Sequence, residues 1–490
     1  QTDSASLFRT QREHASPVAA LAATAYATPA LRSEAFAGSL SEISVGYEMR
    51  REEKALEQQK GDGGDFGRFS AGSYKHISGK GTVWGDAGYL RGAKRNVVWN
   101  ASSDYDLVFP YVVADSIGGD LTSEEYTFGG GYGHRSGRYT WALEAGARAL
   151  HEYRDSDPRI RNVAIDIDAG AGASVRMGNY RLGLSAALRV YKQSGSQIQY
   201  AHSAGEKGVY HLSGLGSHYA GFEGNANSQT RYRGSGYGLT LALVPDAGRG
   251  GLHLAAGYEY LHIEKELPGS ADLVLQKVVP RSFHAEAAWL RGSGNGLRWG
   301  VALKARYDYR RGDEGIVDDN NSSQGSGTLG FLTLFEYSAL QGRAEAVFGV
   351  EAAGHAWYVC PWGEYRRRTS DYLYPAQNME FTRAGGGVDF RCVLQRRSLL
   401  LRLEAGGGYT AGLDSGLTLP VADLAAPLVR MVQYDYGRLR QDAATFRLGL
   451  RADYALRRRM SLFLAADYGG GLYGDNTAAH HARVACGIAF

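Results

Sequence analysis

Apolar and polar residues alternate with a period of two in segment after segment, from about residue 40 to the last residue. The segment 445–456 shows the pattern most clearly, because one of its faces is entirely apolar: Phe446, Leu448, Leu450, Ala452, Tyr454 and Leu456. Successive side chains of a β-strand point to opposite faces, so such a strand needs water on one side and an apolar medium on the other. Segments 163–176, 297–310 and 399–405 repeat the pattern, which predicts an all-β protein.

The connections between these segments alternate between short and long. The short ones lie near residues 78–81, 134–138, 177–180, 245–250, 291–296, 339–342, 395–398 and 457–459. The long ones lie near residues 50–64, 92–123, 154–161, 193–230, 265–276, 311–325, 358–378, 411–441 and 471–479. This asymmetry is typical of bacterial outer-membrane barrels, with short periplasmic turns and long extracellular loops. We therefore predict a transmembrane antiparallel β-barrel over residues 40–490 with about 18 strands, and 14 or 16 remain open.

Composition agrees with a strand-built membrane protein. The 490 residues include 67 Gly and 32 Tyr but no run of 18 apolar residues, which excludes a helical membrane protein. The mean hydropathy of −0.32 does not exclude a barrel, because alternating strands average to neutral. A net charge of +3 gives no reason to expect a nucleic-acid partner. Soluble β-propellers would show a repeat of about 40 to 50 residues, and none is visible.

The last strand supports the same location. Val484, Cys486, Ile488 and Phe490 share one face of a segment that ends with the chain. This resembles the C-terminal signal of outer-membrane proteins, which is an aromatic last residue with alternating apolar partners. We expect an outer-membrane protein surrounded by outer-membrane lipids, whose signal peptide has been removed.

The polar faces of the strands carry charges of both signs. The candidates for lumen-facing charged residues are Arg306, Asp308, Arg402, Glu404, Arg447, Arg451 and Asp453. The structural interpretation is a lumen filled by salt bridges, and the functional interpretation is a charged permeation path. Mixed signs favour the first, because a selective pore usually shows a bias of sign.

Residues 1–39 do not alternate and are Ala-rich between Ala19 and Ala27. The stretch up to Phe36 resembles the entry segment of fatty-acid-transporter-like barrels, in which the N-terminus folds into the lumen. We expect a lumen-plugging segment or a periplasmic tail. A TonB-dependent transporter would place a plug of well over 100 residues before about 22 strands, so the chain is interpreted as a partner of such a protein at most.

Three predicted external loops carry residues that favour recognition of a partner or ligand. The aromatic and Pro candidates of the first loop are Trp99, Phe109, Pro110 and Tyr111. The second loop holds Asp157, Pro158 and Arg159, and the third holds Tyr219 and Phe222. Apolar residues in external loops pack on each other, fold into the barrel mouth or contact a partner.

The stretches DLVFPYVVADSIGGDLTSEEYTFGGGYGHRSGRYTW, YRDSDPRIRN and GLGSHYAGFEGN resemble a family of uncharacterised outer-membrane barrels from Bacteroidota. The resemblance implies a surface barrel that works beside a TonB-dependent receptor and surface lipoproteins, and it implies no established activity.

No catalytic signature, metal motif or cofactor motif is present in the sequence. The leading hypothesis is a non-enzymatic barrel that acts in uptake or as the integral subunit of a surface complex. The alternatives are a porin-like passive diffusion channel and a rim-located hydrolase that uses loop histidines: His151, His202, His211, His218 and His355.

Overall fold

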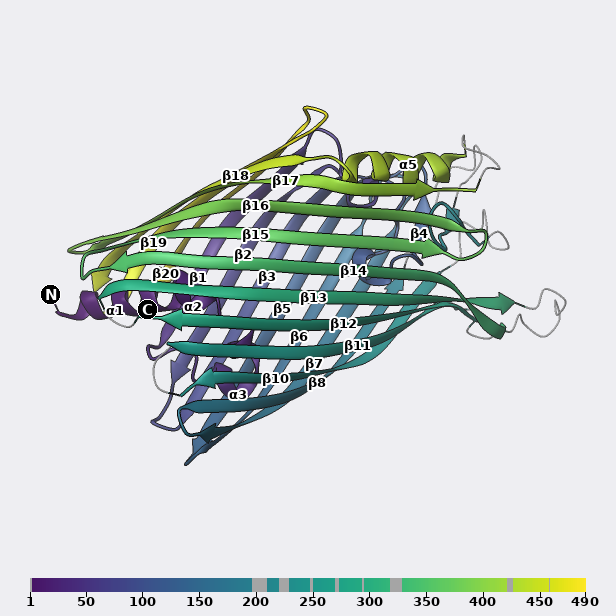
Figure 1. Ribbon diagram of the computed structural model, residues 1–490. Helices are drawn as coiled ribbons and strands as arrows, with labels where there is room; N and C mark the ends of the chain where they lie inside the picture. The colour runs from purple at the N-terminus through teal and green to yellow at the C-terminus, as the bar shows by residue number, and fades with distance from the viewer. Residues whose placement is uncertain are drawn as a thin grey trace.

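Eighteen antiparallel strands close into one barrel in the computed structural model (Figure 1). It describes residues 2–195, 209–219, 229–246, 250–268, 273–292, 295–317, 328–420, 426–457 and 459–490. Each wall strand pairs with the next one along the chain, and β1 pairs with both β2 and β20. The barrel therefore has no free edge, and the backbone of every wall strand finds its partners within the wall.

The wall strands are β1 (Leu40–Glu52), β2 (Gly63–His76), β3 (Gly81–Val97), β5 (Gly119–Ser136), β6 (Tyr139–Tyr153), β7 (Arg161–Met177), β8 (Tyr180–Gly195), β10 (Thr230–Pro245), β11 (Gly251–Leu267), β12 (Leu273–Arg291), β13 (Gly296–Val317), β14 (Thr328–Glu351), β15 (His355–Tyr372), β16 (Gln377–Arg396), β17 (Leu399–Thr418), β18 (Ala443–Arg457), β19 (Met460–Tyr473) and β20 (Ala478–Ala489). The remaining elements are α1 (Thr2–His14), α2 (Pro17–Ala20), η1 (Ala25–Ala27), α3 (Pro29–Arg32), η2 (Gln58–Lys60), α4 (Tyr105–Val108), β4 (Val113–Asp115), β9 (Val209–His211) and α5 (Pro427–Leu439). β4 and β9 pair only with each other, in a small separate sheet.

The predicted count of 18 strands is confirmed, but two predicted connections are wrong. Residues 339–342 lie inside β14, and the short turn is at residues 352–354. Residues 358–378 were predicted as a long loop, but most of them belong to β15, and only residues 373–376 connect it to β16. The basic run 366–368 alternates across this strand: Arg367 is paired with the outward Leu340, and its two neighbours face the lumen.

The outer surface of the wall is a belt of exposed apolar side chains. Leu188, Leu303 and Leu464 are each more than 60% exposed, and each lies on an outward face with other apolar residues. Aromatic pairs flank the belt toward the long-loop end, with ring centroids 4.7 Å apart for Tyr258 and Phe283. A soluble monomer does not expose an apolar surface of this extent, and a closed barrel satisfies its backbone in lipid. The protein is a transmembrane β-barrel of the outer-membrane type.

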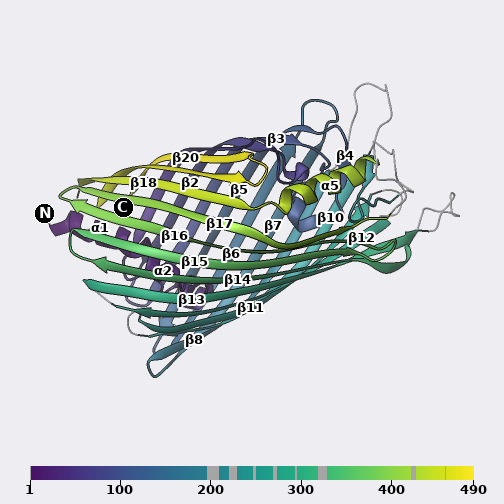
Figure 2. The same cartoon turned by 45° about the horizontal axis from the view of Figure 1, so that its top comes forward.

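Both chain termini lie at the short-turn end (Figures 1 and 2). The seam there is closed by two main-chain hydrogen bonds between Ser41 and Phe490, of 2.7 and 2.9 Å. The short helices that precede β1 enter the lumen at this end, where Phe8, Val18 and Leu21 pack on the inner wall. Over the described part of the chain, the helices are all too short or too polar to span a bilayer.

The topology predicts which residues are accessible from outside the cell. We expect Tyr374→Cys, in the 80%-exposed tip between β15 and β16, to react with a membrane-impermeant maleimide on intact cells. Asn179→Cys, in the short turn between β7 and β8, should react only after the outer membrane is permeabilised. The background is a chain in which Cys360, Cys392 and Cys486 are replaced by Ser. The reverse pattern of labelling would contradict the predicted orientation.

Candidate functional site: a chamber in the lumen

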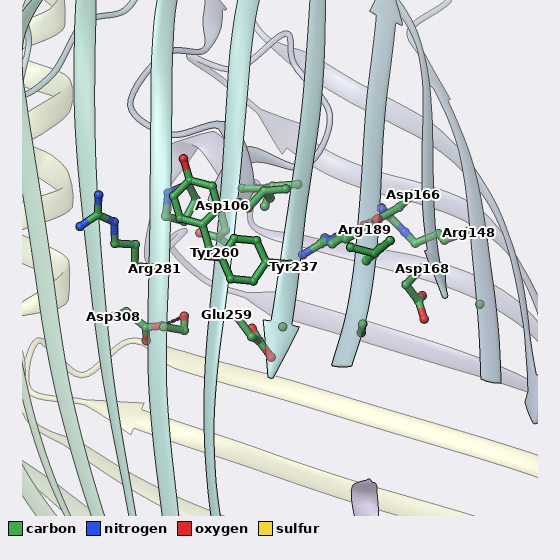
Figure 3. A pocket seen from close by; sticks show the side chains of 18 of the residues that line it. Asp106, Arg148, Asp166, Asp168, Arg189, Tyr237, Glu259, Tyr260, Arg281 and Asp308 are labelled. Atoms are coloured by element: carbon green, nitrogen blue, oxygen red, sulfur yellow. Dashed lines mark hydrogen bonds and ion pairs between the residues drawn. The ribbon is translucent and has the colours of Figure 1, made fainter. Parts of the chain in front are cut away.

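A cavity of about 910 Å³ lies in the middle of the lumen. Its wall is formed by strands from β3 to β15, and charged side chains of both signs surround it (Figure 3). Arg32 of α3 borders it toward the short-turn end, whereas Tyr105, Asp106 and Phe109 border it toward the long-loop end. Two inserted segments of the chain therefore delimit this chamber.

The upper closure is the connection between β3 and β5, which turns inward instead of projecting outward. Tyr232 donates a hydrogen bond to the carbonyl of Tyr111 (2.8 Å), and Asn162 donates one to the carbonyl of Ala101 (2.8 Å). Arg310 donates to the carbonyl of Asp106 (2.7 Å). Three separate wall strands thus hold the main chain of this loop.

A buried ion pair anchors the far end of the upper closure. Arg154 and Asp115 lie 3.3 Å apart, and both side chains are almost fully buried. Asp115 also accepts hydrogen bonds from the main-chain N–H groups of Ile117 and Gly118. Breaking a buried pair by removing one partner typically destabilises a protein by about 3–5 kcal/mol, because the other charge stays buried. The loop is therefore held firmly in its inward position.

Helix α5 forms a second layer over the upper closure. Its apolar face, with Leu428, Met431 and Val432, packs into the same buried cluster as Val108 and Tyr111. On its polar side, Asp435 accepts a hydrogen bond from the Gln59 amide nitrogen (2.8 Å). The long-loop end of the barrel is thus closed by connections that are far apart in the sequence.

Arg438 of α5 binds two further long connections. It donates to the carbonyl of Ala55 (3.3 Å) and pairs with Asp475 (2.8 Å), which lies between β19 and β20. The helix therefore links the loops that follow β1, β17 and β19.

The lower closure is the N-terminal segment. Gln11 donates to Asp453 (3.1 Å), and the wall residue Arg391 donates to the carbonyl of Ala15 (3.0 Å). Arg181 pairs with Glu34 at 3.2 Å. Polar contacts with opposite sides of the wall hold this segment across the lumen.

Within the chamber, some arginines and some carboxylates are paired and others are not. Arg189 binds Asp166 at 2.5 Å and Arg306 binds Asp308 at 2.9 Å. Over the described residues, the inward-facing carboxylates of three other positions form no ion pair, and these positions are Asp86, Asp168 and Glu259. Arg281, Arg310 and Arg368 also line the chamber and form no ion pair within the described part of the chain, so the unpaired groups of the chamber wall carry both signs.

Two glycines leave room for these carboxylates. A β-carbon on Gly129 would lie 3.1 Å from an oxygen of Asp86, and one on Gly146 would lie 2.6 Å from an oxygen of Asp168. Because Gly129 and Gly146 are paired across β5 and β6, the two carboxylates extend over a common glycine floor.

The predicted lumen-facing charged residues all lie on the inward face. Arg306 and Asp308 border the chamber, whereas Arg402, Glu404 and Arg451 line a second cavity of about 440 Å³ on the β17–β18 side. Arg402 and Arg451 both bind Asp453, whose side chain is fully buried, at 3.5 and 2.9 Å. Arg447 pairs with Asp389 at 2.5 Å, and Glu404 pairs with Arg391 at 2.9 Å.

The aromatic residues of the first predicted loop fold into the barrel mouth, which is one of the three arrangements that the sequence left open. Trp99, Pro110 and Tyr111 are buried there, and the ring of Phe109 lies 5.5 Å from that of the wall residue Phe335. Their apolar surface is buried inside the mouth of the same barrel, and their role as contacts for a partner or ligand stays a prediction.

The residues of the other two predicted loops lie apart from the chamber. Asp157 pairs with the exposed Arg159 at 3.0 Å, and Pro158 between them is buried. Tyr219 donates a hydrogen bond to the carbonyl of Gly315 (2.9 Å). Phe222 lies outside the described residues.

The loop histidines do not form one site. His211 is buried in β9, His151 faces outward on β6, and His355 begins β15 at the short-turn end. His218 lies against Tyr210, with ring centroids 5.3 Å apart, and His202 lies outside the described residues. Among the described residues, no group of three or more His, Cys, Asp or Glu side chains could hold a metal ion.

Sequence reasoning missed the residues that close the lumen. Asp104, which binds Arg148 at 2.5 Å, and the pair of Arg154 with Asp115 were not singled out. The segment 411–441 was predicted as a loop, although Pro427 followed by Leu428, Met431 and Val432 has the spacing of an amphipathic helix. That spacing was the available signal for α5.

Burial in α5 raises the pKa of Asp435 to about 7, above an unfolded value of about 3.9. Between these values the folded state binds more protons, so the stability of α5 docking falls as the pH rises and stays low above pH 7. We expect Asp435→Asn to raise the thermal midpoint most at pH 8, by an amount corresponding to about 2–4 kcal/mol, and less at pH 5. The same shift at both pH values in thermal denaturation would contradict this assignment.

Comparison with known proteins places the chain in a family. The model of the family of unknown function DUF6850 matches residues 29–490. The curated proteins searched contain no match.

The solved structures that the chain is similar to include the ferric preacinetobactin receptor BauA of Acinetobacter baumannii, with 9% sequence identity, a TM-score of 0.38, and coverage of 92% of this chain and 79% of that one. They also include the alcaligin outer-membrane receptor FauA of Bordetella pertussis, with 10% identity, a TM-score of 0.36, and coverage of 91% and 76%. Similarity of this degree carries no information on what the present barrel binds. Because the family model covers well over half of its residues, the chain belongs to the family of unknown function DUF6850.

Proposed function

We propose that this protein is a bacterial outer-membrane barrel that acts in uptake and is closed at rest, with opening controlled by a partner. The observation that carries the proposal is the chamber of about 910 Å³ that is bordered by the N-terminal segment on one side and by the inward-turned loop after β3 on the other. A closed compartment between two inserted segments suits stepwise passage or ligand capture, whereas a free diffusion pore keeps a continuous aqueous path.

The strength of the upper closure supports the need for a partner. Opening would break the buried pair of Arg154 with Asp115 and the contacts of Arg148 with Asp104, at 3.3 and 2.5 Å. Rearrangements of this kind are rare without a ligand or partner that binds the open state more tightly. We propose that the barrel is the integral subunit of a surface complex with a TonB-dependent receptor and surface lipoproteins, as its family resemblance implies.

Bilayer conductance tests the closed state. We expect the purified wild-type protein to be silent in planar bilayers, and Asp115→Ala to give discrete openings, because the buried Arg154 loses its partner and the loop loses its anchor. The matched control is Asp155→Ala, which changes an exposed acidic residue near the same rim. Steady ohmic conductance of the wild type would instead establish the passive diffusion channel.

The chamber charges predict the selectivity of the opened barrel. In the Asp115→Ala background we expect little selectivity by sign of charge, because the carboxylates of Asp86, Asp168 and Glu259 line the chamber together with three arginines that form no ion pair among the described residues: Arg281, Arg310 and Arg368. Replacing the three carboxylates by Asn, Asn and Gln should shift the reversal potential in a KCl gradient toward anion preference. An unchanged reversal potential would remove these residues from the permeation path. Neutralising Asp467, which borders the other cavity, is the control.

A further inference from the structure

The unpaired charges of the chamber occupy two separate arcs of the barrel wall. Among the described residues that border the chamber, the carboxylates without an ion pair lie on β3, β7 and β11, and the arginines without one lie on β12, β13 and β15. Asp86 on β3 and Arg368 on β15 are separated by nine wall strands in one direction and by seven in the other. Charges of opposite sign therefore face each other across the lumen.

The acidic arc is built on glycine. One row of cross-strand partners runs over β3, β5, β6 and β7 on the inward face, and it consists of Asp86, Gly129, Gly146 and Asp168. Glu144 lies in the next row, where its partner is Gly170. We call the three carboxylates of Asp86, Glu144 and Asp168 the acidic floor. With glycine beside each of them, no neighbouring side chain covers these groups.

Little in the described part of the chain neutralises the acidic floor. Asp86 and Asp168 are exposed in the lumen and form neither an ion pair nor a side-chain hydrogen bond with a described residue. Glu144 lies 3.9 Å from Arg32 of the N-terminal segment, whose side chain is 43% exposed. An exposed pair at that distance contributes little. The floor is therefore free to bind a cationic group.

On the basic arc, Arg310 and Arg368 flank the ring of Tyr337, with distances of 5.8 and 5.7 Å from guanidinium carbon to ring centroid. Arg368 forms no ion pair and no side-chain hydrogen bond within the described residues, and its Nε is shielded from solvent without a partner. Arg310 donates to the main-chain carbonyls of Phe109 and Asp106, which fix its position and leave its charge unpaired. We call Arg310 and Arg368 the arginine pair.

The loop carboxylates near the arginine pair are already bound to another cation. Glu57 and Asp106 attract Arg368, but both bind Lys60, at 2.7 and 2.8 Å. A guanidinium group with unused donors offers a fork that matches the two oxygens of a carboxylate. The arginine pair therefore suits an anionic group that enters the chamber.

Between the two arcs, the charges of the wall largely cancel. Arg189 binds Asp166, and Arg306 binds Asp308. The carboxylate of Glu259 on β11 attracts both arginines of these pairs. The separation of charge is thus strongest between the acidic floor and the arginine pair.

This separation favours a solute with two charged ends. A simple ion is attracted by one arc and repelled by the other, whereas a solute with a positive end and a negative end gains from both. A single amino acid cannot contact both arcs, because its two charged groups are attached to one carbon atom. A barrel of 18 strands is about 30–35 Å across between backbones, which leaves on the order of 20 Å between the two sets of side-chain charges.

An extended peptide has the required shape. It covers about 3.3 Å per residue, so about six residues span the chamber between the two arcs. The volume of about 910 Å³ lies at the upper end of the range of about 300–1,000 Å³ for ligand pockets. Trp84, Leu107, Phe109 and Leu261 also border the chamber and offer apolar surface to side chains.

We propose that the chamber binds short peptides with free termini, with the amino group on the acidic floor and the carboxylate on the arginine pair. The proposal names a ligand class for the chamber of the proposed uptake barrel, and it rests on that function for its meaning in the cell. Binding at equilibrium is measured separately from opening of the barrel.

Isothermal titration calorimetry of the purified full-length barrel tests the ligand class with a hexapeptide of alternating glycine and serine. The peptide is used with free termini, with an acetylated N-terminus, with an amidated C-terminus, and with both ends blocked. We expect the free form to bind, and each single block to weaken binding about tenfold, because one set of charge-assisted hydrogen bonds is lost. The double block should weaken it about 100-fold, because the two ends lie far apart and their effects add as free energies.

Two sets of variants assign the ends of the peptide. The triple variant Asp86→Asn, Glu144→Gln and Asp168→Asn should lose the effect of acetylation and keep the effect of amidation. Arg368→Gln should reduce the effect of amidation and keep that of acetylation. Asp467→Asn, at the border of the other cavity, is the matched control, and its four affinities should stay within twofold of the wild type. If the triple variant loses the heat-modifiable migration of a folded barrel, Asp168→Asn alone serves instead and should reduce the effect of acetylation.

Three results would each overturn the proposal: equal affinities for the free and the doubly blocked peptide, no binding by either the wild type or Asp115→Ala, and an equal loss of both end effects in the floor variant and in Arg368→Gln. Steady conductance of the wild type would instead remove the closed uptake barrel and leave the peptide affinities as measured. Failure of the ligand class is therefore distinguishable from failure of the proposed function.

Discussion

Backbone hydrogen bonding in lipid is the constraint on which the rest of this structure depends. A strand in the hydrocarbon layer has no water to satisfy its N–H and C=O groups, so the sheet must close on itself. The pairing of β1 with both β2 and β20 provides that closure. Closure in turn fixes an outward apolar face and an inward polar face on every wall strand, which is the reverse of a soluble sandwich.

A barrel of 18 strands is too wide for its own side chains to fill. In this protein, two segments of the polypeptide occupy part of the lumen. The N-terminal helices enter from the short-turn end, and the loop after β3 enters from the long-loop end. Ion pairs hold these inserts in place: Arg154 binds the loop after β3, and Arg181 binds the N-terminal segment. Arg306 and Arg402 are instead paired with other residues of the wall. What remains between the inserts is a chamber lined by charged groups of both signs.

Sequence reasoning succeeded where a property is local and failed where it depends on contacts between distant segments. Alternation gave the faces of β18 correctly, because side-chain direction in a strand follows from the backbone alone. The turn predicted at residues 339–342 failed because Ala339 and Gly342 also fit within a strand, and only pairing with β13 and β15 shows that the strand continues. Trp99 and Tyr111 were placed outside because nothing local distinguishes a loop that folds inward from one that contacts a partner.

The sequence by itself determined the barrel, a count of about 18 strands, the first wall strand near residue 40 and the inward position of residues such as Arg451 and Asp453. These features follow from a two-residue period and from loop lengths, which are read along the chain. Only the tertiary structure decided that the N-terminal segment and the loop after β3 turn into the lumen and that α5 links three connections. Each of these features depends on which loops turn inward and which distant segments meet. Contacts between segments up to several hundred residues apart leave no periodic pattern in the sequence of either segment.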